Sequence, residues 1–346
     1  MKIFLYSIIL TVSSSALVAQ NVNFSDITFK NNLLANLQIN TNGDSEIQVS
    51  EAEAYSGKID CPSRGIKSLD GIQSFKNLTS LNCAMNQLTS IDISQNTNLK
   101  SLNVSSNQLI SLDVSKNLLI TSLVASSNKL TQINVTNNLL LDDFWIGGNL
   151  LTNLDITKNI ALKSLYASGN GFTSLDVSKN VNLGYFLCDN NLLTDLDLSK
   201  NSKLFYLTAF ANRFTSLNLK NGTNTIITYI EIWENPNLKC IQVDDANYSA
   251  ANWLKKDATA SYNTNCLLGT SEIQNSKISV YPNPVKNILN FSEKSNVEIY
   301  NSAGQKLTSS EQSKSVDVSK LSKGIYVIIL KDKSGKEIQK TKIIKE

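Results

Sequence analysis

Leu99-Lys-Ser-Leu102-Asn-Val104-Ser-Ser-Asn107-Gln-Leu109, continued by Ile-Ser-Leu112-Asp-Val114-Ser-Lys-Asn117, is the stretch that decides the fold. Its apolar residues and its two asparagines recur along the chain. One row comprises Asn86, Asn107, Asn128, Asn149, Asn170, Asn191 and Asn212, and a second comprises Asn96, Asn117, Asn138, Asn159, Asn180 and Asn201. Every step is 21 residues. Two registers kept over so many periods indicate a solenoid, in which each unit packs on its neighbours.

A unit of 21 residues is too short for a strand, two turns and a full helix. The second half of each unit, of the form LxxLDVSxN, alternates with period two. We therefore predict a strand on the concave face, an extended or 3₁₀ segment on the opposite face, and no long helices. The recurring asparagine amides both donate and accept hydrogen bonds, so we expect them to join the backbones of adjacent coils rather than to act in catalysis.

The recurring apolar residues and the first asparagine row follow the pattern LxxLxLxxNxL. Residues 58–240 therefore resemble leucine-rich repeats with the short coils of internalin-like bacterial proteins. The resemblance implies a mostly β repeat solenoid of 21-residue coils over residues 58–239. Stacked coils need closed ends. We expect an N-terminal cap over residues 20–57, beginning with a short amphipathic helix that Ser25 or Asp26 caps, and a C-terminal cap over residues 240–266.

None of the five cysteines belongs to a CxxC pair, which gives no support to a zinc or redox site. Cys61, Cys83 and Cys188 occupy the inward column that holds Val104 and Ala125 elsewhere. We expect buried thiols there, the alternative being a strained bond between adjacent strands. Cys240 and Cys266 bracket a segment that resembles the cap of many secreted bacterial repeat proteins, and we expect them to form a disulfide.

The first residues of the chain point to export. Residues 1–19 have the basic start, short apolar run and small residues of a signal peptide, and no other run is long enough to cross a bilayer.

After a polar linker at residues 267–277, residues 278–346 show short alternating apolar runs separated by turns. About seven strands in such a length predict a small Ig-like β-sandwich.

The tail carries recognisable motifs at Tyr281-Pro282-Asn283-Pro284, around Gly304, at Gly324-Ile-Tyr326 and at Lys342-Ile-Ile-Lys345. Together they resemble the C-terminal sorting domain of the type IX secretion system. The resemblance implies passage across the outer membrane, removal of the tail, and attachment of the mature protein to surface lipopolysaccharide. The tail is also rich in lysine, which suits an acidic sorting receptor or simply a solvated surface.

The N-terminal cap contains Asn40-Thr-Asn42-Gly-Asp44-Ser-Glu46-Ile-Gln48-Val-Ser-Glu51, which is close to an EF-hand calcium loop. By position the ligands would be Asn40, Asn42, Asp44, Glu46, Gln48 and Glu51. Asn40 replaces the usual leading Asp, and Ser45 replaces the usual Gly. We therefore predict weak Ca²⁺ binding, the alternative being a turn that only caps the solenoid. No other cofactor is expected.

Composition removes several classes of function. The chain has no histidine, which excludes Ser-His-Asp catalysis and His-ligated metals, and its formal charge of +3 is too balanced for nucleic-acid binding.

On the concave face, the outward residues of early coils are small. Those of later coils are large aromatics beside acids: Asp143, Trp145, Tyr166, Tyr185, Asp189, Tyr206, Phe210, Tyr229, Glu231 and Trp233.

Exposed rings beside acids suit a protein or glycan ligand, although they can equally pack on one another as a cross-strand ladder. We therefore predict a non-catalytic protein, secreted or held at the cell surface, that binds a protein or glycan on its concave face. The first alternative is a structural surface or matrix component without a discrete ligand. The second is a hydrolase that uses Asp189 and Glu231 as paired carboxylates.

Overall fold

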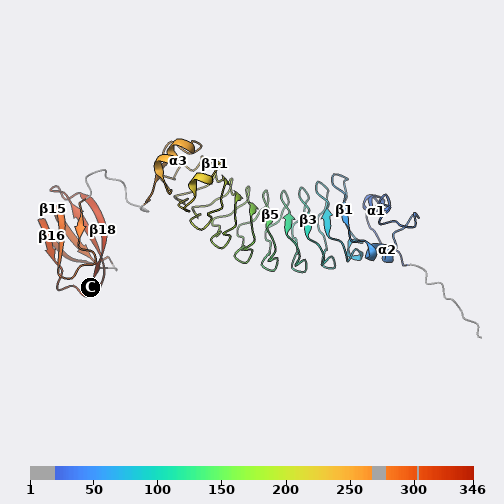
Figure 1. Ribbon diagram of the computed structural model, residues 1–346, viewed down its shortest axis with the longest axis horizontal. Coiled ribbons are helices and arrows are strands. Elements are labelled where there is room, and N and C mark those ends of the chain that lie inside the picture. The colour runs from blue at the N-terminus through green and yellow to red at the C-terminus, as the bar shows by residue number, and fades with distance from the viewer. Residues whose placement is uncertain (1–19, 267–277, 302–303) are drawn as a thin grey trace, which may run out of the picture. The chain divides into compact units, whose positions relative to one another are not determined.

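The structure is a computed structural model that describes residues 20–266, 278–301 and 304–346; the predicted signal peptide and linker lie outside them. The chain divides into two compact units, Met1–Cys266 and Leu267–Glu346, which are described separately (Figure 1).

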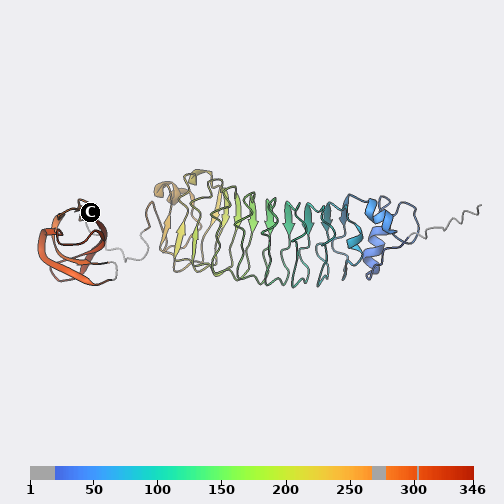
Figure 2. The same cartoon turned by 90° about the horizontal axis from the view of Figure 1, so that it is seen from below.

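The first unit is a parallel β solenoid. Its main sheet has nine strands in the order β1-β2-β3-β4-β5-β6-β7-β9-β11. The strands are β1 (Lys58–Asp60), β2 (Ser80–Asn82), β3 (Ser101–Asn103), β4 (Ser122–Val124), β5 (Asp143–Trp145), β6 (Ser164–Tyr166), β7 (Tyr185–Leu187), β9 (Tyr206–Thr208) and β11 (Tyr229–Glu231). Figure 2 shows them side by side as a row of arrows. The predicted repeat of one strand per coil is confirmed.

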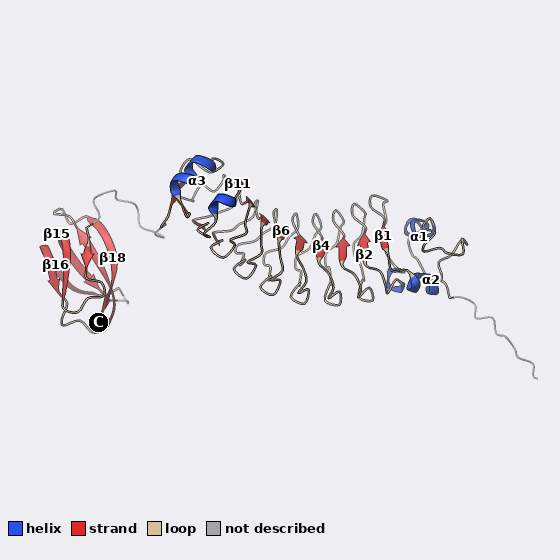
Figure 3. Ribbon diagram, viewed as in Figure 1, coloured by secondary structure: helices blue, strands red, loops and turns tan. Residues whose placement is uncertain are grey.

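The extended return side that the period-two alternation predicts is present as strands in the last coils. In the last coils it forms a second parallel sheet in the order β13-β12-β10-β8, made of β8 (Asp195–Asp197), β10 (Ser216–Asn218), β12 (Cys240–Gln242) and β13 (Ser261–Asn263). Short 3₁₀ turns occur at η1 (Ile72–Ser74) and η2 (Asn224–Ile226). In Figure 3 the helices lie only at the two ends of the solenoid.

The two asparagine rows join the coils as expected. Asn107 Nδ2 donates to the carbonyl of Cys83 in the preceding coil and to that of Val104 in its own, both at 3.0 Å, while its Oδ1 accepts from the amide of Leu88. In the second row, Asn117 Nδ2 donates to the carbonyls of Ile93 and Asn96. Each asparagine thereby satisfies backbone groups that the short strands leave unpaired.

The solenoid core consists of fully buried apolar columns that run from coil to coil. Cys61, Cys83 and Cys188 lie in one of them as buried free thiols, so the alternative of a bond between adjacent strands does not apply. Burial raises the pKa of Cys61 to about 12 and raises those of Cys83 and Cys188 well above their usual range.

Both caps contain short helices. Helix α1 (Ile27–Leu34) begins at Asp26, whose Oδ1 accepts from the amides of Thr28 and Phe29. Helix α2 (Val49–Ala54) follows the loop of residues 40–48. At the other end, α3 (Ala246–Asn252) packs beside the last coils, and the expected disulfide joins Cys240 to Cys266.

The second unit is an antiparallel β domain with its own core. Its strands are β14 (Val280–Tyr281), β15 (Ile288–Tyr300), β16 (Lys306–Asp317), β17 (Gly324–Lys331) and β18 (Glu337–Lys345). The prediction of about seven short strands is wrong for the described residues, which contain five. Two of the short apolar runs, at residues 288–291 and 297–300, belong to one long strand, because β15 continues through a register shift between Asn290 and Ser295.

Candidate functional site on the strand face

The strand face is the surface formed by the outward side chains of the nine-stranded sheet and of the residues that directly follow each strand. In each strand the middle residue is buried, so its neighbours point outward. From β1 to β4 the outward positions of the strands are charged, small or amidic. From β5 onward they carry large rings, as the alternation of the sequence predicts.

Three tyrosine rings from successive strands stack on one another. The centroids of Tyr185 and Tyr206 lie 4.5 Å apart with an interplanar angle of 29°, and those of Tyr206 and Tyr229 lie 4.5 Å apart at 11°. Both faces of the Tyr206 ring are therefore covered by its neighbours. The three residues are half-buried, so part of this tyrosine ladder stays accessible to solvent.

Two further aromatic pairs flank the ladder. Phe210 and Trp233 stack with centroids 4.8 Å apart at 6°, and Trp145 meets Tyr166 edge-on at 5.7 Å. Trp145 and Trp233 keep 38% and 37% of their surface exposed. A Cβ atom at Gly147 would lie 2.7 Å from the ring of Tyr166, so glycine at this position lets that ring lie against the backbone.

The two acids Asp143 and Glu231 each hold a ring on the same strand. Asp143 Oδ1 accepts from Trp145 Nε1 at 2.7 Å, and Glu231 Oε1 accepts from Tyr229 Oη at 2.6 Å. Glu231 also forms an ion pair with Lys255, whose ammonium lies 4.7 Å from the centroid of the Tyr229 ring. Each aromatic side chain is thus fixed in orientation by a carboxylate.

Asp189, which the sequence predicts to lie exposed beside the rings, is instead buried. Its position points outward, but only 8% of the residue is exposed. Ser168 Oγ donates to its Oδ1 at 2.7 Å, Thr208 Oγ1 donates to the same oxygen, and Asn190 Nδ2 donates to Oδ2. The carboxylate therefore joins three coils and does not form part of the accessible surface.

The electrostatics of the face follow from burial and from this hydrogen bonding. Hydrogen bonds from Lys255 and Tyr229 lower the pKa of Glu231. Burial raises the pKa of Tyr185 and Tyr206, and the neighbouring tyrosine hydroxyl adds to each shift. The phenols therefore stay protonated and the carboxylate stays charged at neutral pH.

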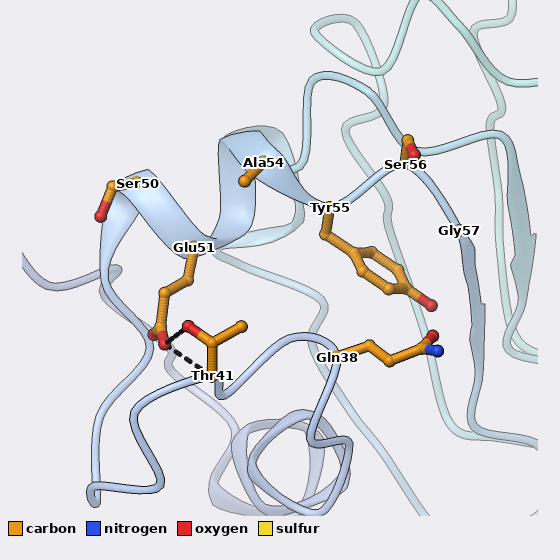
Figure 4. Close-up of a pocket in the computed structure, with 8 residues that line it drawn as sticks. All are labelled: Gln38, Thr41, Ser50, Glu51, Ala54, Tyr55, Ser56 and Gly57. Carbon is orange, nitrogen blue, oxygen red and sulfur yellow. Dashed lines mark hydrogen bonds between the residues drawn. The ribbon is translucent and has the colours of Figure 1, made fainter.

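The residues of the predicted calcium loop come together in the N-terminal cap. Glu51 Oε1 accepts from the amide and hydroxyl of Thr41 at 2.7 and 2.8 Å (Figure 4). Its Oε2 accepts from the amide of Gln48. These bonds outweigh burial and lower the pKa of Glu51. Glu51 and Thr41 lie at one end of a shallow pocket, and Gln38 and Tyr55 lie at the other.

The remaining loop residues also bind one another. Asn42 Nδ2 donates to Asp44 Oδ2 and to Gln48 Oε1, Asn40 Nδ2 donates to the carbonyl of Asp44, and Glu46 pairs with Lys30 at 2.6 Å. Within the described residues, no three His, Cys, Asp or Glu side chains gather as a metal site. The calcium site stays a prediction that depends on the amide and carbonyl oxygens of this loop.

The tail motifs, far apart in sequence, meet in space. Asn283 Nδ2 donates to the carbonyl of Lys342, and Asn283 Oδ1 accepts from the amide of Ile344. Tyr326 Oη donates to the carbonyl of Ser322 in the turn before its own strand. Lys345 is 8% exposed, and its ammonium donates to the carbonyl of Glu346. Much of the signature therefore holds the domain together.

Residues 279–346 match the family described as the secretion system C-terminal sorting domain. The tail is such a sorting domain. It implies secretion to the cell surface or the extracellular space. Among the described residues, no helix combines the length and the apolar character that crossing a bilayer requires.

Solved structures match the solenoid. An internalin of Listeria monocytogenes is similar at 20% identity and a TM-score of 0.54, over 72% of this chain and 80% of that one. Internalin C2 of the same species matches at 18% identity and 0.47, over 71% and 97%, and a leucine-rich repeat protein of Leptospira interrogans at 23% and 0.48, over 60% and 54%. The likeness to the first of these structures shows that the solenoid has the leucine-rich repeat fold. No curated protein has a significantly similar sequence.

Proposed function

We propose that this chain is a non-catalytic recognition protein that binds a protein or glycan ligand on the strand face of its later coils. The observation that carries the proposal is the gathering of half-exposed rings on β5, β6, β7, β9 and β11, against small, amidic or charged outward residues on the earlier strands. Rigid aromatic side chains supply contact area at little cost in conformational entropy, and they dominate the energetics of interfaces.

Two features favour binding over catalysis. Asp189 is covered by its hydrogen-bond donors, and Glu231 is paired with Lys255, so neither carboxylate of the predicted pair is poised as an acid or a nucleophile. The strand face is also open along its length, and an open face does not exclude water from a reacting bond.

A comparison of two exposed apolar residues tests the location of binding. The full chain, Trp145→Ala and Leu118→Ala would be screened on an array of glycans and cell-surface proteins. Leu118 is 52% exposed and lies outside the strand face, so it is a matched control for loss of apolar area. We expect Trp145→Ala to weaken the strongest interaction about tenfold or more. Equal binding by both variants would contradict the proposal.

The stacking of the tyrosine ladder favours one alternative, a structural surface component without a discrete ligand. In that case the rings would serve only to join adjacent strands, a role that cross-strand aromatic pairs fill in many sheets. An array on which the full chain binds nothing would favour this alternative.

For export, we propose that residues 1–19 direct the chain into the periplasm and that the type IX machinery recognises the sorting domain. The mature protein then crosses the outer membrane, loses the tail and attaches to surface lipopolysaccharide. The support is the match of residues 279–346 to the sorting-domain family.

The loop of residues 40–51 is proposed as a weak calcium site that stabilises the N-terminal cap. With only Asp44 and Glu51 as carboxylate ligands, the dissociation constant should be roughly submillimolar to millimolar. Calcium titration should then raise the melting temperature of the full chain, and Glu51→Gln should abolish the rise. A melting temperature that calcium leaves unchanged would contradict the proposal.

A further inference from the structure

An aromatic residue paired with an acid occurs twice on the strand face, once on its middle strand and once on its last strand. In β5 the pair is Trp145 with Asp143, and in β11 it is Tyr229 with Glu231. In both pairs the polar hydrogen of the ring system points at the carboxylate, so the two groups are held side by side. The two copies differ in what else they contact.

The copy in β11 holds a cation supplied by the chain itself. The ammonium of Lys255 lies 4.7 Å from the centroid of the Tyr229 ring, 3.2 Å from Tyr229 Oη, and in an ion pair with Glu231. An ammonium over a ring face gains cation–π attraction, and the adjacent carboxylate supplies the opposite charge. This copy shows what such a pair binds.

The copy in β5 has only neutral partners. Asp143 accepts from Trp145 Nε1 and from Ser122 Oγ at 3.1 Å, and the nearby Lys163 pairs with Asp142 at 2.9 Å instead. In the part of the chain that the structure describes, no Lys or Arg forms an ion pair with Asp143 or lies over the rings of Trp145 and Tyr166. Trp145 nevertheless keeps 38% of its surface exposed.

We infer that Asp143, Trp145 and Tyr166 form a binding site for an ammonium or guanidinium group of the ligand. The indole of Trp145 offers the strongest cation–π surface among the side chains, and Asp143 supplies the counter-charge beside it. Tyr166 meets the indole edge-on at 5.7 Å and completes the aromatic wall. This inference rests on the proposed function and specifies the chemistry of its ligand.

Nuclear magnetic resonance of the tryptophan indole N–H groups of the full chain tests the site. The chain has three tryptophans, and Trp145→Phe identifies the resonance of Trp145. The probes are Nα-acetyl-lysine amide, Nα-acetyl-arginine amide and tetramethylammonium. Nα-acetyl-norleucine amide, which keeps the aliphatic stem of lysine but lacks its charge, is the neutral control.

We expect saturable shifts of the Trp145 resonance with the cationic amides at millimolar concentrations and none with the norleucine derivative. Asp143→Asn should weaken binding roughly fivefold or more. Asp195→Asn, which removes an exposed acid from β8 in the other sheet, should leave binding unchanged. Equal binding of tetramethylammonium would indicate a free quaternary ammonium ligand, whereas binding of the two amides alone would indicate a basic side chain of a protein.

A Trp145 resonance that responds equally to the norleucine amide, or that shifts equally in Asp143→Asn, would overturn the cation site. A failure of this kind is distinguishable from failure of the proposed function. If Asp143→Asn binds an array ligand as the full chain does while Trp145→Ala does not, the recognition face stands and only the cation site is lost.

Discussion

The three buried thiols illustrate how the place of a residue in the coil sets its chemistry. Cys61, Cys83 and Cys188 fill an inward column in which Val104 and Ala125 stand in other coils. Burial disfavours the thiolate, which is the reactive form, and so raises the pKa of each thiol. Below the raised pKa each group stays protonated, so a cysteine here acts as a small apolar residue.

Thiol titration checks this assignment. At pH 8 the three thiols of the native protein should not react with a thiol reagent, because their thiolate fraction is negligible. Unfolded protein under non-reducing conditions should show three thiols, since Cys240 and Cys266 are joined. Five thiols in the unfolded protein would show that the disulfide is absent.

Two features of the strand face could not be predicted from the sequence, namely the burial of Asp189 and the pairing of Glu231 with Lys255. Strand alternation points Asp189 to the same side as the rings, yet the residue is buried, and its carboxylate accepts from Ser168 and Thr208 of the neighbouring coils. Similarly, the sequence alone does not reveal the pairing of Lys255 with Glu231, because Lys255 follows the last coil and has no periodic position. Contacts between coils depend on which residues the stacking brings into register.

At the scale of the elements, the asparagine rows replace long strands as the source of cohesion. Asn128 Nδ2 donates to the carbonyls of Val104 and Ala125, and its Oδ1 accepts from the amide of Leu109. The row was predictable because its period is strict and amides can donate and accept at once.

The single long strand β15 could not be predicted from the sequence, because the segment between its two apolar parts is polar and resembles a turn.

Asn128→Ala tests this role. The change leaves several buried backbone groups without partners, and each costs about 1–3 kcal/mol, so the free energy of unfolding should fall by roughly 3 kcal/mol. Asn137→Ala is the control, because this asparagine is exposed and lies in neither row; its effect should stay within about 0.5 kcal/mol. Chemical denaturation measures both, and equal effects would contradict the structural role of the row.

At the scale of the whole molecule, the chain combines a leucine-rich repeat solenoid with a sorting domain. Deleting residues 278–346 should leave the solenoid in the periplasm, because the sorting domain is the part that the secretion machinery is proposed to recognise. Fractionation and surface labelling of intact cells measure the distribution. Normal display of the truncated protein at the surface would contradict this part of the account.

Trp233→Ala distinguishes the two roles that the aromatic strand face could have, binding a ligand or merely joining strands. Binding to the array ligand and the free energy of unfolding would be measured on the same preparation. If the face binds a ligand, Trp233→Ala should abolish binding while the free energy of unfolding falls by about 1.5 kcal/mol or less, the size of one exposed aromatic stack. Retained binding together with a larger loss of stability would contradict a binding role for the face.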